Sequence, residues 1–392
     1  MHFDFQTWRR VIGLVGRDRL SPRRLAVQLG LLALLSGWAV FNAFFLALDR
    51  LLYPRLHEVP IEQPVFIVGN ARSGTTLFHR LLCEDEERFV HFRTWELVFP
   101  SIAQKKGVRG LVTSFRRFFP ATFQRLVAWE SRLLPELRKQ HPIALDKPEE
   151  DELLMLMSFS SVMLAILFPY VEQLPELMHF EHRPASVRSK LLDFYRGCVM
   201  RQLYYRQLYY AGGQRTLVSK NPAFVSKMRD LGREFPDAKF VYLVRNPFET
   251  VPSLIKLLRT MWEGLGVDEA HMESGTRGLL EGCIRDYFYA LEVLDELPPE
   301  RYAIVQYAEL IADPKASVES VYRRLGLSIS PAFEARLAAE RSRQKRYHSS
   351  NAYSLEEYGI DPEELEEWLA PVLERFGFEQ KKLSDEQTRE ML

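Results

Sequence analysis

The chain has 392 residues, of which 47% are hydrophobic and 27% are charged. This composition is typical of a globular protein and excludes a disordered or collagen-like chain. Lysine plus arginine and aspartate plus glutamate are equal at 52 each, so no global positive field draws the protein to nucleic acid. The three cysteines, Cys83, Cys198 and Cys283, are too few for a disulfide framework and lack metal-ligand spacing.

The N-terminal segment contains a long apolar run over residues 25–48, without a charged side chain. The run is long enough to span a bilayer as a helix and too long for a cleavable signal peptide. Ser21 and Pro22 predict the helix start, and Pro54 predicts its end. A buried core helix is the alternative interpretation.

After Pro60 the chain alternates between strand-like and helix-like segments. We expect helices at residues 75–82 and 186–210, and a helix opening within 146–152 with Pro148 in its first turn. The apolar stretch 153–168 is short for a membrane span, so it should pack in the core or line a pocket. Strands are expected at residues 63–68, 89–92, 216–219, 239–244 and 301–306. This alternation predicts an α/β fold with a mainly parallel sheet and helices on both faces.

The strongest chemical signal is the sequence VFIVGNARSGTT at residues 65–76. A strand leads through a loop with glycines five residues apart into a helix, the layout that places backbone N–H groups around a phosphate. Nucleotide triphosphatases need a lysine where this chain has Thr75, and the nearest cation is Arg72. The loop therefore suits a 5′-phosphate and argues against ATP or GTP hydrolysis. A tight glycine turn before a capped helix is the structural alternative.

The loop GNARSGTT resembles the 5′-phosphosulfate loop of sulfotransferases that use 3′-phosphoadenosine 5′-phosphosulfate (PAPS), in the variant with arginine that is typical of a bacterial branch. The sequence YLVRNPFETVPS at residues 242–253 is similar to that family's 3′-phosphate motif, in which Arg245 and Ser253 would hold the phosphate. The resemblance extends over about residues 64–375. A basic tail loop of the family is not intact here, which leaves Lys345 and Arg346 as weak candidates.

The resemblance implies roles for particular residues. Lys220, at the end of a predicted strand, is similar to a family lysine that reaches the transferring group; an ordinary exposed lysine is the alternative. Sulfuryl transfer has a loose transition state that fixed cations and N–H donors can stabilise, so we expect no metal. The residues expected to bind the 5′-phosphosulfate are Arg72, Ser73, Gly74, Thr75 and Thr76, with Arg72 also assisting catalysis.

The acceptor hydroxyl needs a general base. Better-known cytosolic members have a histidine where this chain has Pro222. Glu96 is the first candidate, because burial beside Trp95 could raise the pKa of its carboxyl group. His141 and Glu150 are the alternatives.

Together these features predict a PAPS-dependent sulfotransferase with a P-loop-like α/β core over residues 59–392, a helical insertion at about 100–212, and a membrane-associated segment over residues 1–58. The expected acceptor is a hydroxylated lipid or lipid-linked molecule. A nucleotide or small-molecule kinase that binds ATP with Mg²⁺ is one alternative function. A non-catalytic membrane scaffold with the same fold is the other.

The polar residues of the N-terminal helix indicate how it meets the membrane. Gln28, Asn42 and Asp49 are spaced by multiples of seven and form one polar side. Because the loop variant looks bacterial and the donor is cytoplasmic in bacteria, we expect a monotopic attachment. The helix would be tilted or in-plane, with this side against the protein and the active site in the cytoplasm. A eukaryotic enzyme would instead face the Golgi lumen. The arginines that bias the N-terminus toward the cytoplasm are Arg9, Arg10, Arg17, Arg19, Arg23 and Arg24.

Overall fold

A computed structural model describes residues 1–130, 144–209, 215–344 and 355–379. Its centre is a five-stranded sheet in the order β2-β3-β1-β4-β5, in which every neighbouring pair is parallel. The strands are β1 (Val65–Val68), β2 (Phe89–Val90), β3 (Thr216–Lys220), β4 (Lys239–Val244) and β5 (Tyr302–Gln306). The predicted parallel sheet is therefore confirmed, with a shorter β2 than expected.

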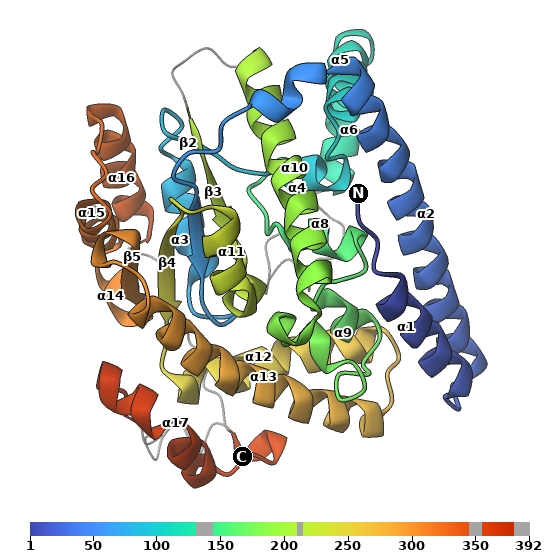
Figure 1. Cartoon of the computed structure of the whole chain (residues 1–392), viewed down its shortest axis with the longest axis vertical. Helices are drawn as coiled ribbons and strands as arrows, with labels where there is room; N and C mark the ends of the chain where they lie inside the picture. Colours follow the sequence, from blue (N-terminus) through green and yellow to red (C-terminus); the bar gives the residue numbers. More distant parts are fainter. Residues whose placement is uncertain (131–143, 210–214, 345–354, 380–392) are drawn as a thin grey trace.

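Helices cover both faces of the sheet (Figure 1). Side chains alternate along β1, so that Val65 and Ile67 pack on one face and Phe66 and Val68 on the other. The helices that flank the strands or follow them are α3 (Thr75–Cys83), α11 (Met228–Glu234), α12 (Pro247–Gly264), α13 (Glu269–Asp295), α14 (Tyr307–Ala312), α15 (Pro314–Arg324), α16 (Pro331–Gln344) and α17 (Pro362–Phe376). Helices α3 and α15 cover the first face, whereas α10, α11 and α13 cover the second.

A long helical insertion lies between β2 and β3. Its helices are α4 (Thr94–Val98), α5 (Ile102–Phe118), α6 (Pro120–Glu130), α8 (Glu152–Met157), α9 (Met163–Leu167) and α10 (Ala185–Tyr209). Short 3-10 helices occur at Pro54–Glu58, Pro175–Leu177, Phe180–His182, Pro222–Lys227, Pro299–Arg301 and Glu356–Tyr358. The apolar stretch 153–168 is divided between α8 and α9 and contributes buried side chains to two core clusters, as expected for a core segment.

The predicted helix opening at Pro148 is wrong. Helix α8 begins only at Glu152, and Pro148 forms an isolated antiparallel bridge with Arg93. The backbone N–H of Glu149 donates to the carbonyl of Phe92 at 3.1 Å. These pairings hold the chain extended against the end of β2, and this tertiary contact overrides the local helix signal.

The two N-terminal helices lie against the insertion on the side of the molecule away from the sheet (Figure 1). Helix α1 comprises Phe5–Arg17 and α2 comprises Pro22–Leu52, with Ser21 as the N-cap of α2. Both predicted ends of α2 are confirmed. Within the described residues, α2 is the one helix that is long and apolar enough to cross a membrane by length and composition.

The polar side of α2 faces the protein. Gln28, Asn42 and Asp49 are buried, and the Asn42 side-chain oxygen accepts a hydrogen bond from the Gln104 amide at 3.0 Å. The Asp49 carboxylate accepts hydrogen bonds from the Ile102 backbone N–H and the Arg201 guanidinium, each at 2.9 Å. A carboxylate at this point stabilises the N-terminus of α5. Helix α2 is therefore joined to the insertion by specific polar contacts.

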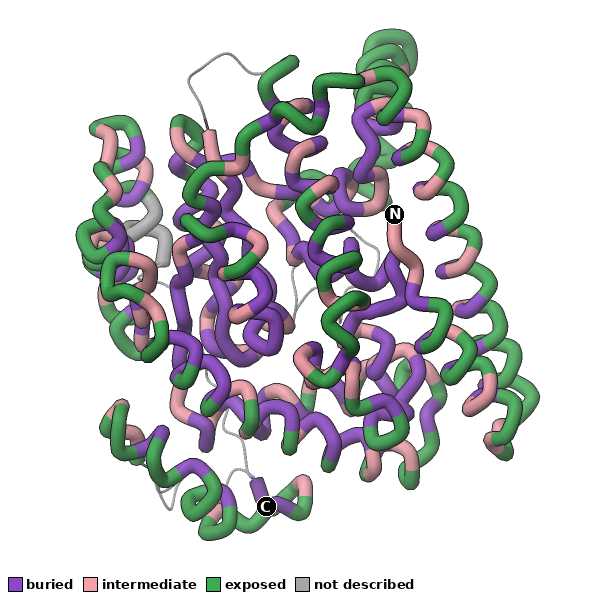
Figure 2. Tube along the Cα trace, viewed as in Figure 1, coloured by how far each residue is buried: buried purple, intermediate pink, exposed green. Residues whose placement is uncertain are grey.

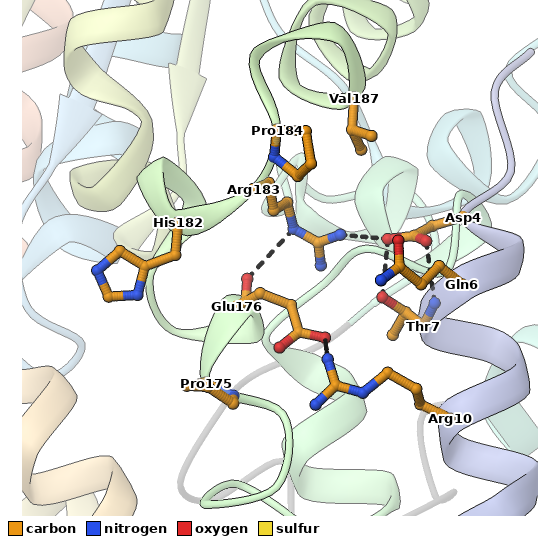
Figure 3. Close-up of a pocket in the computed structure, with 10 residues that line it drawn as sticks. All are labelled: Asp4, Gln6, Thr7, Arg10, Pro175, Glu176, His182, Arg183, Pro184 and Val187. Atoms are coloured by element: carbon orange, nitrogen blue, oxygen red, sulfur yellow. Dashed lines mark hydrogen bonds and ion pairs between the residues drawn. The ribbon is translucent and has the colours of Figure 1, made fainter.

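Helix α1 is attached through a polar pocket (Figure 3). Arg183 pairs with Asp4, and Arg10 pairs with Glu176, around a cavity of about 280 Å³. The charged groups neutralise one another in pairs, and no residue of the loop at 69–76 lines the cavity. This pocket therefore joins α1 to the insertion and is separate from the predicted phosphate site.

Candidate functional site

The loop after β1 has the backbone shape of a phosphate cradle. Gly69 and Gly74 have φ angles of 142° and 89°, which L-residues rarely adopt. A Cβ on Gly69 would lie 2.2 Å from the Leu243 carbonyl oxygen, and a Cβ on Gly74 would lie 2.8 Å from the Tyr307 ring. Arg72 also has a positive φ of 75°, a strained conformation of the kind that gathers at functional sites. These glycines let the backbone turn into the N-terminus of α3, where its N–H groups suit an anion.

Three of the residues predicted to bind phosphate meet at this loop. The Arg72 Nε donates a hydrogen bond to the Ser253 hydroxyl at 3.1 Å. One Arg245 Nη donates to the Arg72 carbonyl oxygen at 3.1 Å. Residues 72, 245 and 253 come from the β1 loop, the end of β4 and α12, and β1 and β4 are neighbours in the sheet. Hydrogen bonds thus connect Arg72, Ser253 and Arg245 around this one loop.

Two further residues position Arg245, and the sequence analysis did not assign them. Glu249 accepts a hydrogen bond from Arg245 Nε at 3.0 Å, one helical turn along the chain. The guanidinium carbon of Arg245 lies 4.4 Å from the centre of the Tyr307 ring, a stacking arrangement that arginine favours. The i,i+4 spacing of Arg245 and Glu249 and the place of Tyr307 directly after β5 are the sequence signals that could have identified them.

Lys220 ends β3 beside the same loop. Its side chain is buried, and its Nζ donates to Glu150 Oε1 at 2.5 Å and lies 3.4 Å from the Thr76 hydroxyl. The alternative of an ordinary exposed lysine is therefore wrong. Because β3 and β4 flank β1, a lysine, a threonine and a carboxylate gather next to the arginine pair. Glu150, an alternative general base from its sequence, is thus the carboxylate in direct contact with Lys220.

Glu96 is buried beneath this region with a different set of partners. Its Oε2 accepts hydrogen bonds from the Arg93 backbone N–H and the Gln202 amide, each at 2.9 Å, and from Arg206 at 3.1 Å. The first of these bonds belongs to a capping box at the start of α4. Its closest partners thus hold α4 and α10 together. His141, the third candidate base, lies outside the described residues, as do Lys345 and Arg346.

Burial also alters the titration of groups around Lys220. It raises the pKa of the Asp151 carboxyl group to about 7, and the Tyr195 hydroxyl donates to that carboxyl at 2.6 Å. Burial, followed by the charge of Lys220, lowers the pKa of His79 well below its ordinary value. Near neutral pH the His79 imidazole is therefore uncharged and the Asp151 carboxyl group is only partly ionised, so the cations of the site are Lys220 and the arginines.

The sequence of the chain matches a known family. The sequence model described as "Sulfotransferase family" matches residues 64–331, more than half of the chain. The chain belongs to this family. Among curated relatives, the omega-hydroxy-beta-dihydromenaquinone-9 sulfotransferases Stf3 of Mycobacterium bovis and Mycobacterium tuberculosis are each 26% identical over 331 residues, covering 81% of this chain and 76% of theirs.

Solved sulfotransferases share the fold. STF9 from Mycobacterium avium superposes with a TM-score of 0.73 at 20% identity, covering 97% of this chain and 94% of that one. STF1 from Mycobacterium tuberculosis gives a TM-score of 0.69 at 19% identity, with coverage of 94% and 93%. This coverage shows that nearly the whole chain has the fold of these solved structures. The family match and the curated relatives show that the protein is an enzyme of the sulfotransferase class.

Proposed function

We propose that this sulfotransferase moves a sulfuryl group from PAPS to a hydroxyl of a lipid or lipid-linked acceptor at a membrane. The convergence of Arg72, Arg245 and Ser253 at one loop carries the proposal for the donor. PAPS has two separate phosphate-bearing ends, and the two arginines come from the two motifs that resemble its two binding sites. The curated relatives act on a hydroxylated menaquinone, which supports a lipid acceptor.

The donor fits the residues present. The Gly74 N–H group, the hydroxyls of Thr75 and Thr76, and Arg72 would hold the 5′-phosphosulfate, while Arg245 and Ser253 would hold the 3′-phosphate. Ser73 would shape the loop, because its N–H group and its hydroxyl donate to the Asn70 carbonyl at 3.2 and 2.6 Å. Glu249 neutralises part of the Arg245 charge in the absence of ligand, so a 3′-phosphate would compete with this carboxylate for the guanidinium.

Chemistry in this site is an in-line displacement at sulfur. The acceptor oxygen forms a bond to sulfur, the bond from sulfur to the bridging phosphate oxygen breaks, and 3′-phosphoadenosine 5′-phosphate leaves. Lys220 would stabilise the charge that develops on the bridging oxygen, in the manner of a preorganised cation. Lys220 is expected to lie beside the transferring group, and Glu150 contacts Lys220 directly. We therefore assign the removal of the acceptor proton to Glu150 instead of Glu96.

Matched glutamine variants separate the two carboxylates. Glu150→Gln should lower kcat by about 100-fold or more, the usual contribution of a general base, with unchanged nucleotide affinity. Glu96→Gln should retain turnover and lower the melting temperature, because it weakens a buried pair with Arg206. If turnover collapsed in the Glu96 variant and not in the Glu150 variant, Glu96 would be the general base.

Calorimetric titration without metal tests the donor. Tight binding of 3′-phosphoadenosine 5′-phosphate together with no binding of ATP is the expected result. Binding of ATP would favour a kinase, and binding of neither nucleotide would favour a scaffold. Loss of a sulfated lipid on deletion of the gene would then identify the acceptor.

The exposed side of α2 supports attachment to a membrane. From Leu25 to Ala47 every exposed residue of the helix is apolar, whereas the polar side is buried against the protein. A helix on the surface of a soluble domain has the opposite arrangement, with its apolar side buried and its polar side exposed. We propose an in-plane helix with the catalytic domain in the cytoplasm. Protease treatment of intact spheroplasts should leave the domain uncut, and digestion from outside would overturn this orientation.

A further inference from the structure

Helices α5 and α6 form a second exposed apolar surface beside α2. Beyond the first turn of α5, where Ile102, Gln104 and Lys105 are buried, no residue up to Trp129 is buried. Figure 2 shows this hairpin as exposed tube next to one end of α2. Its exposed large hydrophobic side chains are Leu111, Val112, Phe118, Phe119, Leu126, Val127 and Trp129. A surface helix pair of a soluble protein would carry polar residues at most of these positions.

The charge of the hairpin is almost entirely positive. Over α5 and α6 the single acidic residue is Glu130, at the end of α6. Their exposed cations are Lys106, Arg109, Arg116, Arg117 and Arg125. The chain as a whole has no net charge, so this positive segment is a local feature. Exposed aromatic and aliphatic side chains interspersed with arginines are the pattern of helices that lie in the interface of an anionic membrane.

The base of the hairpin is rigidly joined to α2. Asp49 of α2 binds the first turn of α5 through the Ser101 hydroxyl and the Ile102 and Ala103 backbone N–H groups, at 2.9 to 3.0 Å. Burial lowers the pKa of Lys105 to about 8, and its Nζ donates to Gln202 of α10 at 2.5 Å. The orientation of the hairpin relative to α2 is therefore set by buried polar contacts at its root.

The same root adjoins the catalytic region. Helix α4 directly precedes α5, and the Thr94 backbone N–H donates to the Lys147 carbonyl at 3.1 Å, three residues before Glu150. A membrane that binds the hairpin would thus hold the catalytic domain at a point close to the segment that contains Glu150.

We propose that the α5–α6 hairpin is a second membrane-binding element, which inserts its apolar side chains into a bilayer containing anionic lipids. Together with α2 it attaches the enzyme at two places and fixes the orientation of the catalytic domain on the membrane. The inference rests on the proposed action at a membrane. It adds a second group of exposed cations, five on the hairpin, to Arg23 and Arg50 near the two ends of α2.

Site-specific labelling tests the proposal in the full-length protein. The three native cysteines are buried, so a cysteine introduced at an exposed position can be modified selectively. Phe119→Cys carrying a polarity-sensitive fluorophore should shift to the blue on addition of vesicles with phosphatidylglycerol. Trp368→Cys, an exposed aromatic position on α17, is the matched control and should show no shift. No shift at position 119 would overturn the proposal.

Vesicle partitioning tests the charge. The triple variant Arg116→Gln, Arg117→Gln, Arg125→Gln should bind phosphatidylglycerol vesicles about 100-fold more weakly, from the attraction expected of three arginines near an anionic surface. Binding to phosphatidylcholine vesicles should be unchanged. Equal binding of wild type and variant to both vesicles would overturn the charge selectivity.

The remaining outcome is that a second copy of the chain covers the hairpin. Light scattering of wild type and of Phe118→Ser, Phe119→Ser, Trp129→Ser decides this: a dimer that the substitutions dissociate would overturn membrane binding. Affinity for 3′-phosphoadenosine 5′-phosphate should stay within twofold in every hairpin variant. If the wild-type protein did not bind 3′-phosphoadenosine 5′-phosphate, the proposed function would be contradicted. The vesicle experiments would still decide whether the hairpin binds a membrane.

Discussion

The candidate active site and the outer side of α2 differ in how they use charge. At the strand ends, cations from separate elements are brought together: Arg72, Lys220 and Arg245 lie around one loop, held by local carboxylate and hydroxyl partners. On the side of α2, polar groups are turned inward and the apolar side chains face out. The first region gathers positive charge, and the second exposes apolar side chains. Four substitutions test this contrast, from the largest expected effect to the smallest.

Replacing Lys220 by methionine should break the cation cluster most severely. The side chain is buried, and methionine fills a similar volume without the charge. We expect kcat to fall by about 1,000-fold, the upper range for a preorganised group that stabilises transition-state charge. Single-turnover kinetics measures this. Affinity for 3′-phosphoadenosine 5′-phosphate, which lacks the sulfuryl group, should change by less than about threefold. A variant with normal turnover would contradict a role of Lys220 in catalysis, direct or through Glu150.

Replacing Asp49 by asparagine should break the inward polarity of α2. The substitution keeps the shape but leaves Arg201 buried without its carboxylate and weakens the anion at the start of α5. We expect a loss of about 3 kcal/mol in the free energy of unfolding, typical for one partner of a buried pair. Urea unfolding in detergent measures the change. Arg50→Gln, at the next and exposed position, is the control and should lie within about 0.5 kcal/mol of wild type.

In each of the two regions, the sequence predicts some features and not others. Arg72, Arg245 and Ser253 belong to two contiguous motifs, and the parallel topology brings strand ends together, so their meeting was predictable. The contact of Glu150 with Lys220 was not, because it depends on the chain at 147–149 pairing with the end of β2 instead of forming a helix. Likewise, the spacing of Gln28, Asn42 and Asp49 predicted the buried side of α2, whereas the exposure of α5 and α6 depends on tertiary packing that local periodicity does not encode.

Replacing Arg245 by alanine should sharpen the assignment of the two phosphate sites. The guanidinium is stacked on Tyr307 and paired with Glu249, so its loss removes one oriented charge without opening the core. Affinity for 3′-phosphoadenosine 5′-phosphate should fall by about 10- to 100-fold, as expected for charge-assisted hydrogen bonds. Affinity for adenosine 5′-phosphate, which has no 3′-phosphate, should not change. Calorimetry with both ligands decides, and an equal loss for both would move Arg245 to the 5′ site.

Replacing Asp151 by asparagine should change the pH dependence of stability. Burial raises the pKa of this carboxyl group to about 7, so between about pH 4 and 7 the folded protein holds a proton that the unfolded chain has released. The free energy of unfolding of wild type should therefore fall as pH rises through this window, by at most about 1.4 kcal/mol per pH unit from this group. An asparagine oxygen can still accept from the Tyr195 hydroxyl, and the amide does not titrate.

The decisive measurement is the difference in unfolding free energy between the two proteins at pH 5, 6, 7 and 8. The variant should gain stability relative to wild type as pH rises, and the difference should level off above about pH 7, where the carboxyl group is ionised in both states. A pH-independent difference would mean that Asp151 is already ionised in the fold at pH 5. In that case the Asp151 carboxylate would add negative charge beside Lys220, and the cation cluster at the strand ends would be weaker than its geometry indicates.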